Sequence, residues 1–481
     1  MPASAQRFRL SLTLILGLVV YAATLAMGSR LLDDPDPYWH IVAGRWIIAH
    51  RAVPYQDIFS HSAPGIPWVA HEWLAEIVMA ALYDRLGWAG LVVAASLCFA
   101  ATIALLLRAL LRYLEPPAAL IAAGMAWGVC LPHLLARPHV FTLPIAVLWV
   151  SVLVAARADD TAPSPWAALL MLLWANFHGG YLLGIGLAAL FAGEMALDQP
   201  DWRAVRVRAL DWTIFLGLSV LAVAATPNGI AGVTMPFRLL GMDSVMATVT
   251  EWQSPNFQHP QPLEPWLMLA LLGALCFGIR LPVTRAAMLL LLLHLALAHR
   301  RFAEILGIAA PVLVAPALAP QLASLAATPI GIRMARLASP TAPGGLALTG
   351  VIAALMAGIV VHRSVVNDKP RFTPAAAVAF VQAQRITGPV FNAYNFGGYL
   401  IFSGIAPFID GRADMYGDAI VRRYQDIAAL PDLLAEYRIT WTLLPPRDAR
   451  VTVLDHLPGW RRAYADDRAV VHALDGAATA R

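Results

Sequence analysis

Long runs of apolar residues without charged side chains recur along most of the chain, and they limit the folds that are open to it. A helix needs roughly 20 apolar residues to cross the hydrocarbon core of a bilayer, and fewer where loops dip into it. By this measure the sequence predicts about eleven membrane-spanning helices. We expect them near residues 10–27, 88–107, 118–132, 140–156, 166–177, 181–196, 212–225, 265–278, 286–298, 305–322 and 346–361.

The composition agrees with a membrane protein. Of the 481 residues, 59% are hydrophobic and only 13% are charged, and the mean hydropathy is +0.65. These values exclude a water-soluble globular domain. The net charge of +4 does not indicate a nucleic-acid partner, because the arginines lie scattered at the ends of apolar runs instead of forming a basic stripe.

The distribution of arginine predicts the orientation in the membrane. Arg7 and Arg9 precede the first apolar run, which favours a cytoplasmic N-terminus. We interpret that run as a signal anchor; a cleaved signal peptide is the alternative, although the run is longer than a usual signal core and no clean small-residue site follows it. An odd number of spans then places the C-terminal segment outside the cytoplasm.

The sequence predicts two domains and a mainly α fold. Residues 1–363 form a polytopic membrane helix bundle with a long first outside loop at 29–87, and residues 364–481 form a small extracytoplasmic α/β domain. In the small domain we expect a helix at 372–385 capped by Thr373, strands at 389–392, 406–410 and 441–444, and a helix at 421–437.

The first outside loop begins with three carboxylates, Asp33, Asp34 and Asp36, directly after a membrane helix. Carboxylates at the level of the lipid headgroups are costly unless they are solvated or used. A helix cap is the structural alternative, but a cap needs one Asp and not three. Further along the same loop lie His40, His71 and Glu72.

A few arginines fall in outside loops, against the general bias. They are Arg137, Arg238, Arg300 and Arg301. A guanidinium at the outer membrane surface is suited to a phosphate, which it binds with two parallel hydrogen bonds. Snorkelling to lipid headgroups is the alternative.

Other polar side chains accumulate on the same outer face: His139, Asn176, His178 and Glu251. This asymmetry predicts a site at the outer membrane surface. In the small domain, Asp410 and Arg412 follow a predicted strand, where open α/β sheets place ligands. A structural Asp–Arg pair in a turn remains equally open there.

Five short motifs carry a resemblance to a known family. They are DDPDPYWH at 33–40, GRW at 44–46, DIFS at 57–60, WANFHGG at 174–180 and FIDGRAD at 408–414. With the apolar runs and the small outside domain, the chain resembles the GT-C superfamily of integral-membrane glycosyltransferases. It is most similar to the bacterial branch of mannosyltransferase-like and lipid A sugar-transferase-like proteins.

The resemblance implies transfer of a sugar from a polyprenyl-phosphate donor to a lipid or glycan acceptor, on the outer side of a bacterial inner membrane. The essential carboxylate of such enzymes opens the first outside loop and acts as a general base in a direct displacement. By position it is Asp34 or Asp36; Asp36, beside the aromatic Tyr38 and Trp39, is the first candidate and Asp34 the second. The predicted donor-phosphate residues are Arg137, His139, Arg300 and Arg301. The predicted substrate-binding residues are His40, His71, Glu72, Asn176, His178, Glu251, Asp410 and Arg412.

Some members of the superfamily need a divalent metal. The loop histidines and carboxylates have suitable ligand chemistry, but no ligand spacing establishes a site, so the metal residues stay unknown.

Three other functions remain open. A transporter or flippase of lipid-linked glycans would also span the membrane many times, although such proteins usually keep polar groups at the bilayer midplane and show repeats. Here the runs hold few polar residues, such as Glu194 and His294, and we find no repeat. A transferase similar to O-antigen ligases and a non-catalytic assembly protein are the remaining alternatives.

Overall fold

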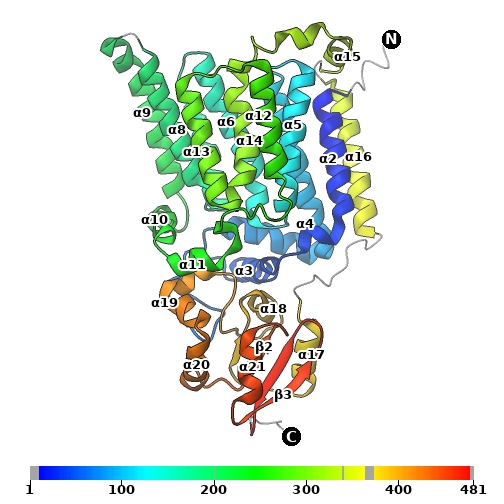
Figure 1. The fold of residues 1–481 in the computed structure, drawn as a ribbon, viewed down its shortest axis with the longest axis vertical. Coiled ribbons are helices and arrows are strands. Elements are labelled where there is room, and N and C mark those ends of the chain that lie inside the picture. The colour runs from blue at the N-terminus through cyan, green and yellow to red at the C-terminus, as the bar shows by residue number, and fades with distance from the viewer. Residues whose placement is uncertain (1–9, 200, 339–340, 363–372, 477–481) are drawn as a thin grey trace. The chain divides into compact units, whose positions relative to one another are not determined.

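The computed structural model describes residues 10–199, 201–338, 341–362 and 373–476 (Figure 1). Within these residues the chain divides into two compact units. The bundle unit comprises the described parts of Met1–Gly28, Val92–Gly229 and Thr250–Val365; the sheet unit comprises those of Ser29–Leu91, Ile230–Val249 and Val366–Arg481. The predicted domain boundary at 363–364, the predicted helix start at Phe372 and the orienting Arg7 and Arg9 lie outside the described residues.

The bundle unit is built from apolar helices that coincide with the predicted runs (Figure 1). They are α2 (Leu12–Met27), α5 (Pro116–Cys130), α6 (Leu143–Ala158), α7 (Ala168–Phe177), α8 (Tyr181–Asp198), α9 (Trp202–Ala224), α12 (Leu263–Phe277), α13 (Val283–Ala298), α14 (Ala303–Leu318) and α16 (Pro343–His362), with the short α15 (Pro329–Leu337) between the last two. The helix α14 packs against α5, α6 and α13. It approaches α5 so closely that a Cβ on Gly307 would lie 2.3 Å from Val129.

Helix lengths and compositions identify a membrane protein. Within the described residues, seven helices are long and apolar enough to cross a membrane. Shorter apolar helices lie at Pro165–Phe177, Gly229–Leu240, Leu263–Phe277 and Val283–Ala298. Because exposed leucine and valine side chains cover helices such as α12 and α16, these surfaces suit lipid and not water.

The helix α4 (Trp73–Leu110) belongs to both units and changes character along its length. At Gly87 the backbone leaves the helical region, with φ 60° and ψ −154°, a conformation that glycine adopts at low cost. The predicted run at 88–107 begins directly after this break. The segment before it carries the polar residues Glu76 and Asp84.

The sheet unit surrounds a small sheet with short helices (Figure 1). Its helices are α3 (Asp36–His50), α10 (Gly229–Leu240), α11 (Asp243–Thr248), α17 (Ala375–Ala383), α18 (Gly397–Phe402), α19 (Ala413–Gln425), α20 (Leu430–Glu436) and α21 (Ala449–His456). The strands β1 (Val390–Asn392), β2 (Trp441–Leu444), β3 (Trp460–Ala465) and β4 (Val470–Leu474) pair in the order β1-β2-β4-β3. The pair β1–β2 is parallel and the other two are antiparallel.

The predictions for the small domain were confirmed in part. Two of the three expected strands exist as β1 and β2, but 406–410 is not a strand. The backbone of 406–410 makes its hydrogen bonds with groups other than a neighbouring strand. Phe408 N–H donates to the Asn392 side chain at 2.7 Å, and the Pro407 carbonyl accepts from His61 N–H. The sequence analysis missed β3 and β4.

The helices of the small domain also differ from the predictions. The single helix expected at 421–437 is broken into α19 and α20, because Asp426 caps a short turn by accepting from Ala428 N–H at 2.9 Å and Pro431 starts the second helix. Thr373 does not cap α17. Its hydroxyl lies 2.9 Å from that of Tyr38, and Pro374 occupies the cap position.

Candidate functional site

Two short turns of the bundle unit carry the predicted residues Glu251, Arg300 and Arg301. The turn η5 (Thr250–Trp252) precedes α12, and η6 (Arg300–Phe302) links α13 to α14. His299 Nδ1 lies 2.6 Å from the Trp252 carbonyl, and Arg300 N–H donates to the Gln253 carbonyl at 3.0 Å. The two turns are therefore fixed to one another.

Arg301 and His178 approach each other as two hydrogen-bond donors. The guanidinium Nη2 of Arg301 lies 3.3 Å from His178 Nε2, while His178 Nδ1 accepts the N–H of Gly180 at 3.1 Å. A neutral imidazole accepts at one nitrogen only, so Nε2 carries its proton. The Cζ of Arg301 also lies over the Trp252 ring, 4.3 Å from its centroid, and this cation–π contact helps to hold the guanidinium. Two converging donors of this kind suit an anionic oxygen.

Arg137 is neutralised by a carboxylate from the opposite turn. Its Nη1 donates to Glu251 Oε1. Burial by itself would raise the pKa of Glu251, but the neighbouring Arg137 and Arg301 outweigh it and lower that pKa to about 2. Glu251 is therefore ionised at neutral pH, and it offsets part of the positive charge of the arginines.

His139, which follows Arg137, lies beside a second carboxylate. Its Nε2 is 3.8 Å from Glu304 Oε2, and its ring centroid is 6.4 Å from that of His178. Glu304 is buried, and its Oε1 has no hydrogen-bond partner among the described residues. Burial and the charge of Arg300 lower the pKa of the nearby His133 to about 4. The His133 imidazole is therefore neutral at pH 7, although charged arginines lie nearby.

In the sheet unit, the predicted catalytic carboxylates form the start of α3. Asp34 Oδ1 accepts the N–H of Asp36 at 2.9 Å, and Asp36 Oδ1 accepts the indole N–H of Trp39 at 3.2 Å. Both carboxylates are nearly buried, with 9% and 8% of their surface exposed. Asp34 thus caps the turn that presents Asp36.

His40 connects this turn to the start of α4. Its Nδ1 lies 3.4 Å from Glu76 Oε1 and its Nε2 lies 3.7 Å from Glu72 Oε2. His71 Nε2 lies 3.8 Å from the other oxygen of Glu72. The helices α3 and α4 can meet closely because Gly44 has no side chain. A Cβ on Gly44 would lie 2.0 Å from the Glu76 carbonyl oxygen.

Asp410 and Arg412 lie in the turn before α19, and both are fully buried. Arg412 donates to both oxygens of Asp410, at 2.8 and 2.6 Å, and to Asp57 Oδ1 at 2.7 Å. Although burial by itself would lower the pKa of Arg412, the adjacent carboxylates raise it above its usual range. This ion cluster is held among protein groups. Sequence reasoning missed the Asp57–Arg412 pair, because 355 residues separate the two.

The structure thus brings the predicted residues together in two groups. The bundle unit contains Arg137, His139, His178, Glu251, Arg300 and Arg301; the sheet unit contains Asp34, Asp36, His40, His71, Glu72, Asp410 and Arg412. Asn176 lies in the last turn of α7, where its amide donates to the Leu172 carbonyl at 2.7 Å. The sequence analysis missed Glu304, whose only signal is a carboxylate in the first turn of an apolar run.

Two solved membrane-protein structures resemble this chain over most of its length. The archaeal oligosaccharyltransferase AglB from Archaeoglobus fulgidus, in complex with an inhibitory peptide and a dolichol-phosphate, matches with a TM-score of 0.53 and 10% identity, over 89% of this chain and 69% of that one. ArnT from Cupriavidus metallidurans, bound to undecaprenyl phosphate, matches with a TM-score of 0.51 and 14% identity, over 96% of this chain and 97% of that one. The chain has the GT-C fold. No protein-family model and no curated protein sequence matches it.

Metal ligation finds no support in the GT-C fold of this chain. Among the described residues, no three His, Cys, Asp or Glu side chains are grouped so that they could hold a metal ion. The described residues therefore give no support to a bound divalent metal.

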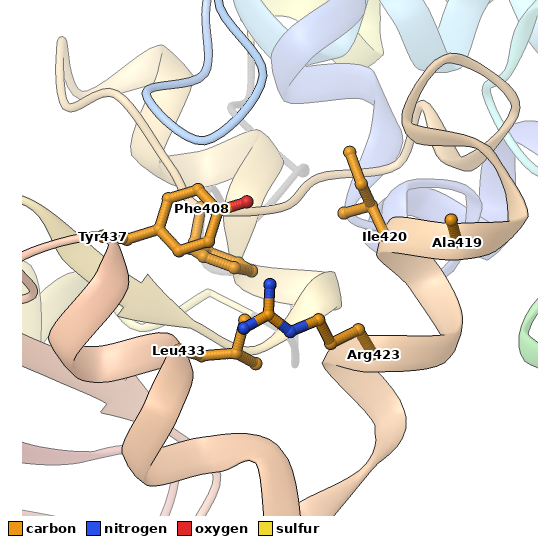
Figure 2. A pocket seen from close by; sticks show the side chains of 6 residues that line it. All are labelled: Phe408, Ala419, Ile420, Arg423, Leu433 and Tyr437. Carbon is orange, nitrogen blue, oxygen red and sulfur yellow. The ribbon is translucent and has the colours of Figure 1, made fainter.

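A pocket in the sheet unit lies apart from the predicted residues. Figure 2 shows it, with a volume of about 160 Å³ and a lining of Phe408, Ala419, Ile420, Arg423, Leu433 and Tyr437. Its one charged group, Arg423, already donates to Glu436 at 2.5 Å. No predicted site residue of the GT-C fold lines this pocket.

Proposed function

We propose that this protein is a membrane glycosyltransferase that moves a sugar from a polyprenyl-phosphate-linked donor to a lipid or glycan acceptor outside the cytoplasm. The fold supports the proposal, since ArnT was solved with undecaprenyl phosphate and AglB with a dolichol-phosphate. One observation in this chain carries it. Arg301 and His178 present two donors 3.3 Å apart at the end of membrane helices, where the phosphate of a polyprenyl lipid would lie.

The arginines of the bundle unit hold the donor phosphate in this proposal. The bond between the anomeric carbon and the phosphate oxygen breaks during transfer, so negative charge grows on the phosphate. Arg301, stacked on Trp252, donates to that oxygen together with His178, and Arg137, Arg300 and His139 complete the anion site. Donors that are fixed in advance stabilise the leaving group without reorganisation.

Asp36 acts as the general base. The acceptor hydroxyl forms a bond to the anomeric carbon while its proton passes to the Asp36 carboxylate, and the polyprenyl phosphate leaves as an anion. Asp34 keeps Asp36 in place through its hydrogen bond to the Asp36 N–H. His40, His71, Glu72 and Asn176 remain predicted contacts to the substrate.

A transfer assay tests this proposal. Purified protein in detergent is supplied with undecaprenyl-phosphate-linked radiolabelled sugar and a bacterial lipid extract as acceptor. We expect Asp36→Asn to lower turnover by about 10³-fold and Asp34→Asn to lower it less. Asp84→Asn is the matched control, because Asp84 is an exposed carboxylate paired with Arg45 in the same unit.

Each outcome decides between the candidate functions. Undiminished transfer in Asp36→Asn and Asp34→Asn would remove the base assignment. Movement of the labelled lipid across a vesicle membrane without cleavage would favour a flippase instead.

The proposed orientation places the N-terminus in the cytoplasm and the C-terminal domain on the periplasmic side of a bacterial inner membrane. It rests on the arginine distribution of the sequence. A C-terminal alkaline phosphatase fusion, which is active only outside the cytoplasm, should be active in whole cells. An inactive phosphatase fusion together with a fluorescent cytoplasmic reporter would reverse the orientation.

A further inference from the structure

The turn Asp410-Gly411-Arg412 lies directly against the carboxylate of Asp36. A Cβ on Gly411 would lie 2.2 Å from Asp36 Oδ1 and 2.8 Å from Trp39 Nε1. Both distances are far shorter than van der Waals contact. Gly411 does not have a positive φ, so its missing side chain serves close approach and not an unusual backbone conformation.

A second glycine, Gly398, allows the helix α18 to approach α3 closely. The helix α18 packs against α3, and a Cβ on Gly398 would lie 2.6 Å from the carbonyl oxygen of Pro35. Within the sheet unit, the start of α18 and the residue before Asp36 thus approach closely. A side chain at Gly411 therefore has no room unless the Asp36 carboxylate moves.

Arg412 anchors this turn on the first outside loop. Its guanidinium bonds Asp57 at 2.7 Å and Asp410 at 2.8 and 2.6 Å, and only 1% of its surface is exposed. The rings of Phe59 and Trp68 lie 5.0 and 4.8 Å from its central carbon. A buried cation with this many partners has one position, because any shift would strand a charge.

The partner Asp57 orders the loop that receives the guanidinium. Its carboxylate accepts the N–H of Phe59 and of Ser60, each at 3.1 Å. The loop continues along the segment before Gly411, where Ser62 Oγ donates to the Phe408 carbonyl at 2.5 Å. The first loop and the 407–412 segment therefore form one rigid body around Asp36 within the sheet unit.

We propose that Gly411 and Arg412 are positioning residues for the reaction. Gly411 fixes the Asp36 carboxylate and its Trp39 partner by close contact, and the Asp57–Arg412–Asp410 cluster keeps Gly411 there. This inference rests on the proposed function, in which Asp36 is the base. Neither residue touches the reacting atoms; each acts through Asp36.

The variant Gly411→Ala tests the contact without removing a functional group. The atoms nearest the new methyl group are the ends of two side chains and not backbone, so the protein can keep its fold by moving the Asp36 carboxylate. A displacement of about 1 Å lowers turnover by about 100-fold. We expect this loss in kcat, with an unchanged KM for the undecaprenyl-phosphate-linked sugar and a thermal midpoint close to that of the wild type.

A double-mutant cycle with Asp36→Ala separates this inference from the proposed function. Asp36→Ala removes the nearest atom that the methyl group would meet and leaves only Trp39 Nε1, at 2.8 Å, so Gly411→Ala should then cause no further loss of residual turnover. Equal effects of Gly411→Ala in both backgrounds would overturn the positioning role. If Asp36→Ala itself keeps wild-type turnover, the proposed function fails, and the turnover of Gly411→Ala in the two backgrounds still reports the contact.

Arg412→Lys tests the anchor and has a matched control. Lysine keeps the charge but lacks the fork that bonds two carboxylates at once, so kcat should fall while the KM for the donor stays unchanged. Arg450→Lys is the control, because Arg450 makes a similar forked pair with Asp448, at 2.9 and 2.6 Å, in the same unit. Equal losses of kcat in Arg412→Lys and Arg450→Lys would mean that Arg412 only stabilises the fold. The proposed role of Arg412 in holding Gly411 beside Asp36 would then be wrong.

Gly350→Ala is the control for the glycine variant. A Cβ at Gly350 meets nothing within 4 Å, so the wild-type kcat is expected. Full turnover in Gly411→Ala would contradict the inference, whatever the thermal midpoint.

Discussion

Arg137 and Glu251 form a salt bridge between two turns that are 114 residues apart in the sequence. The pair is not sealed, since 20% of the arginine side chain and 38% of the glutamate side chain are exposed. A second anion can therefore reach the guanidinium. Glu251 competes with any phosphate that Arg137 would bind.

Removing the charge of Glu251 should strengthen phosphate binding. In Glu251→Gln, Arg137 loses its paired carboxylate, Arg301 loses a nearby negative charge, and the positive potential around the two arginines rises. We expect the Kd for undecaprenyl phosphate to fall roughly fivefold, equivalent to about 1 kcal/mol, as measured by titration in detergent. Glu264→Gln, an exposed carboxylate at the start of α12, is the control. Weaker binding would mean that Glu251 holds Arg137 in place and does not compete.

The same pair predicts how stability depends on pH. The pKa of Glu251 falls from 4.5 to about 2 in the folded protein, so the unfolded chain binds the proton more readily. The stabilisation is complete above the unfolded value of 4.5 and is lost as the pH falls towards 2. The gap in thermal midpoint between wild type and Glu251→Gln should therefore shrink across this window. A gap that stays constant would refute the ion-pair explanation.

Much of the bundle could be predicted from the sequence, because the lipid leaves few choices. A span must satisfy its own backbone, so apolar length alone identifies a helix, and each predicted run overlaps one. Loop asymmetry likewise predicted Arg137, Arg301 and Glu251 as site residues, because polar residues at membrane ends stand out against apolar runs, and the structure brings the three into one unit. Their pairing could not be predicted, since no local pattern relates turns that meet only in the folded chain.

The small domain shows where sequence patterns fail. The segment 406–410 has strand-like composition, yet Asn392 takes the hydrogen bonds that a partner strand would supply. The strand β3 carries Arg461 and Arg462 and is largely exposed, so its composition does not differ from that of a loop. Gly411 could be read only as a turn residue, because its contact with Asp36 depends on chain segments far apart.

Arg301 should not tolerate lysine if it binds phosphate as a fork. Lysine keeps the charge. It loses the guanidinium that lies over the Trp252 ring, and it cannot bind a phosphate with two parallel hydrogen bonds as arginine can. We expect Arg301→Lys to raise the Kd for undecaprenyl phosphate about tenfold, which is about 1.4 kcal/mol. Arg45→Lys, at an exposed pair in the sheet unit, should bind as the wild type does. An unchanged Kd in Arg301→Lys would place the phosphate elsewhere.

A buried carboxylate inside the bundle should control its stability. Glu194 on α8 accepts from Arg285 Nε at 2.7 Å and from Thr284 Oγ1 at 2.8 Å, and Arg157 Nε lies 3.6 Å away. Glu194→Ala would leave Arg285 buried without its partner, at a cost of about 3–5 kcal/mol, and should lower the thermal midpoint in detergent. Glu264→Ala, at an exposed site, should not.

The double variant Glu194→Leu with Arg285→Met distinguishes charge pairing from packing at this position. Replacing both members of a buried ion pair by apolar side chains removes the stranded charge, so much of the lost stability should return. The thermal midpoint of the double variant should exceed that of Glu194→Ala. If the double variant is less stable than Glu194→Ala, the ion pair stabilises the folded protein by more than the cost of removing its charges from water. Arg157 and Thr284 must then also stabilise the bundle through Glu194.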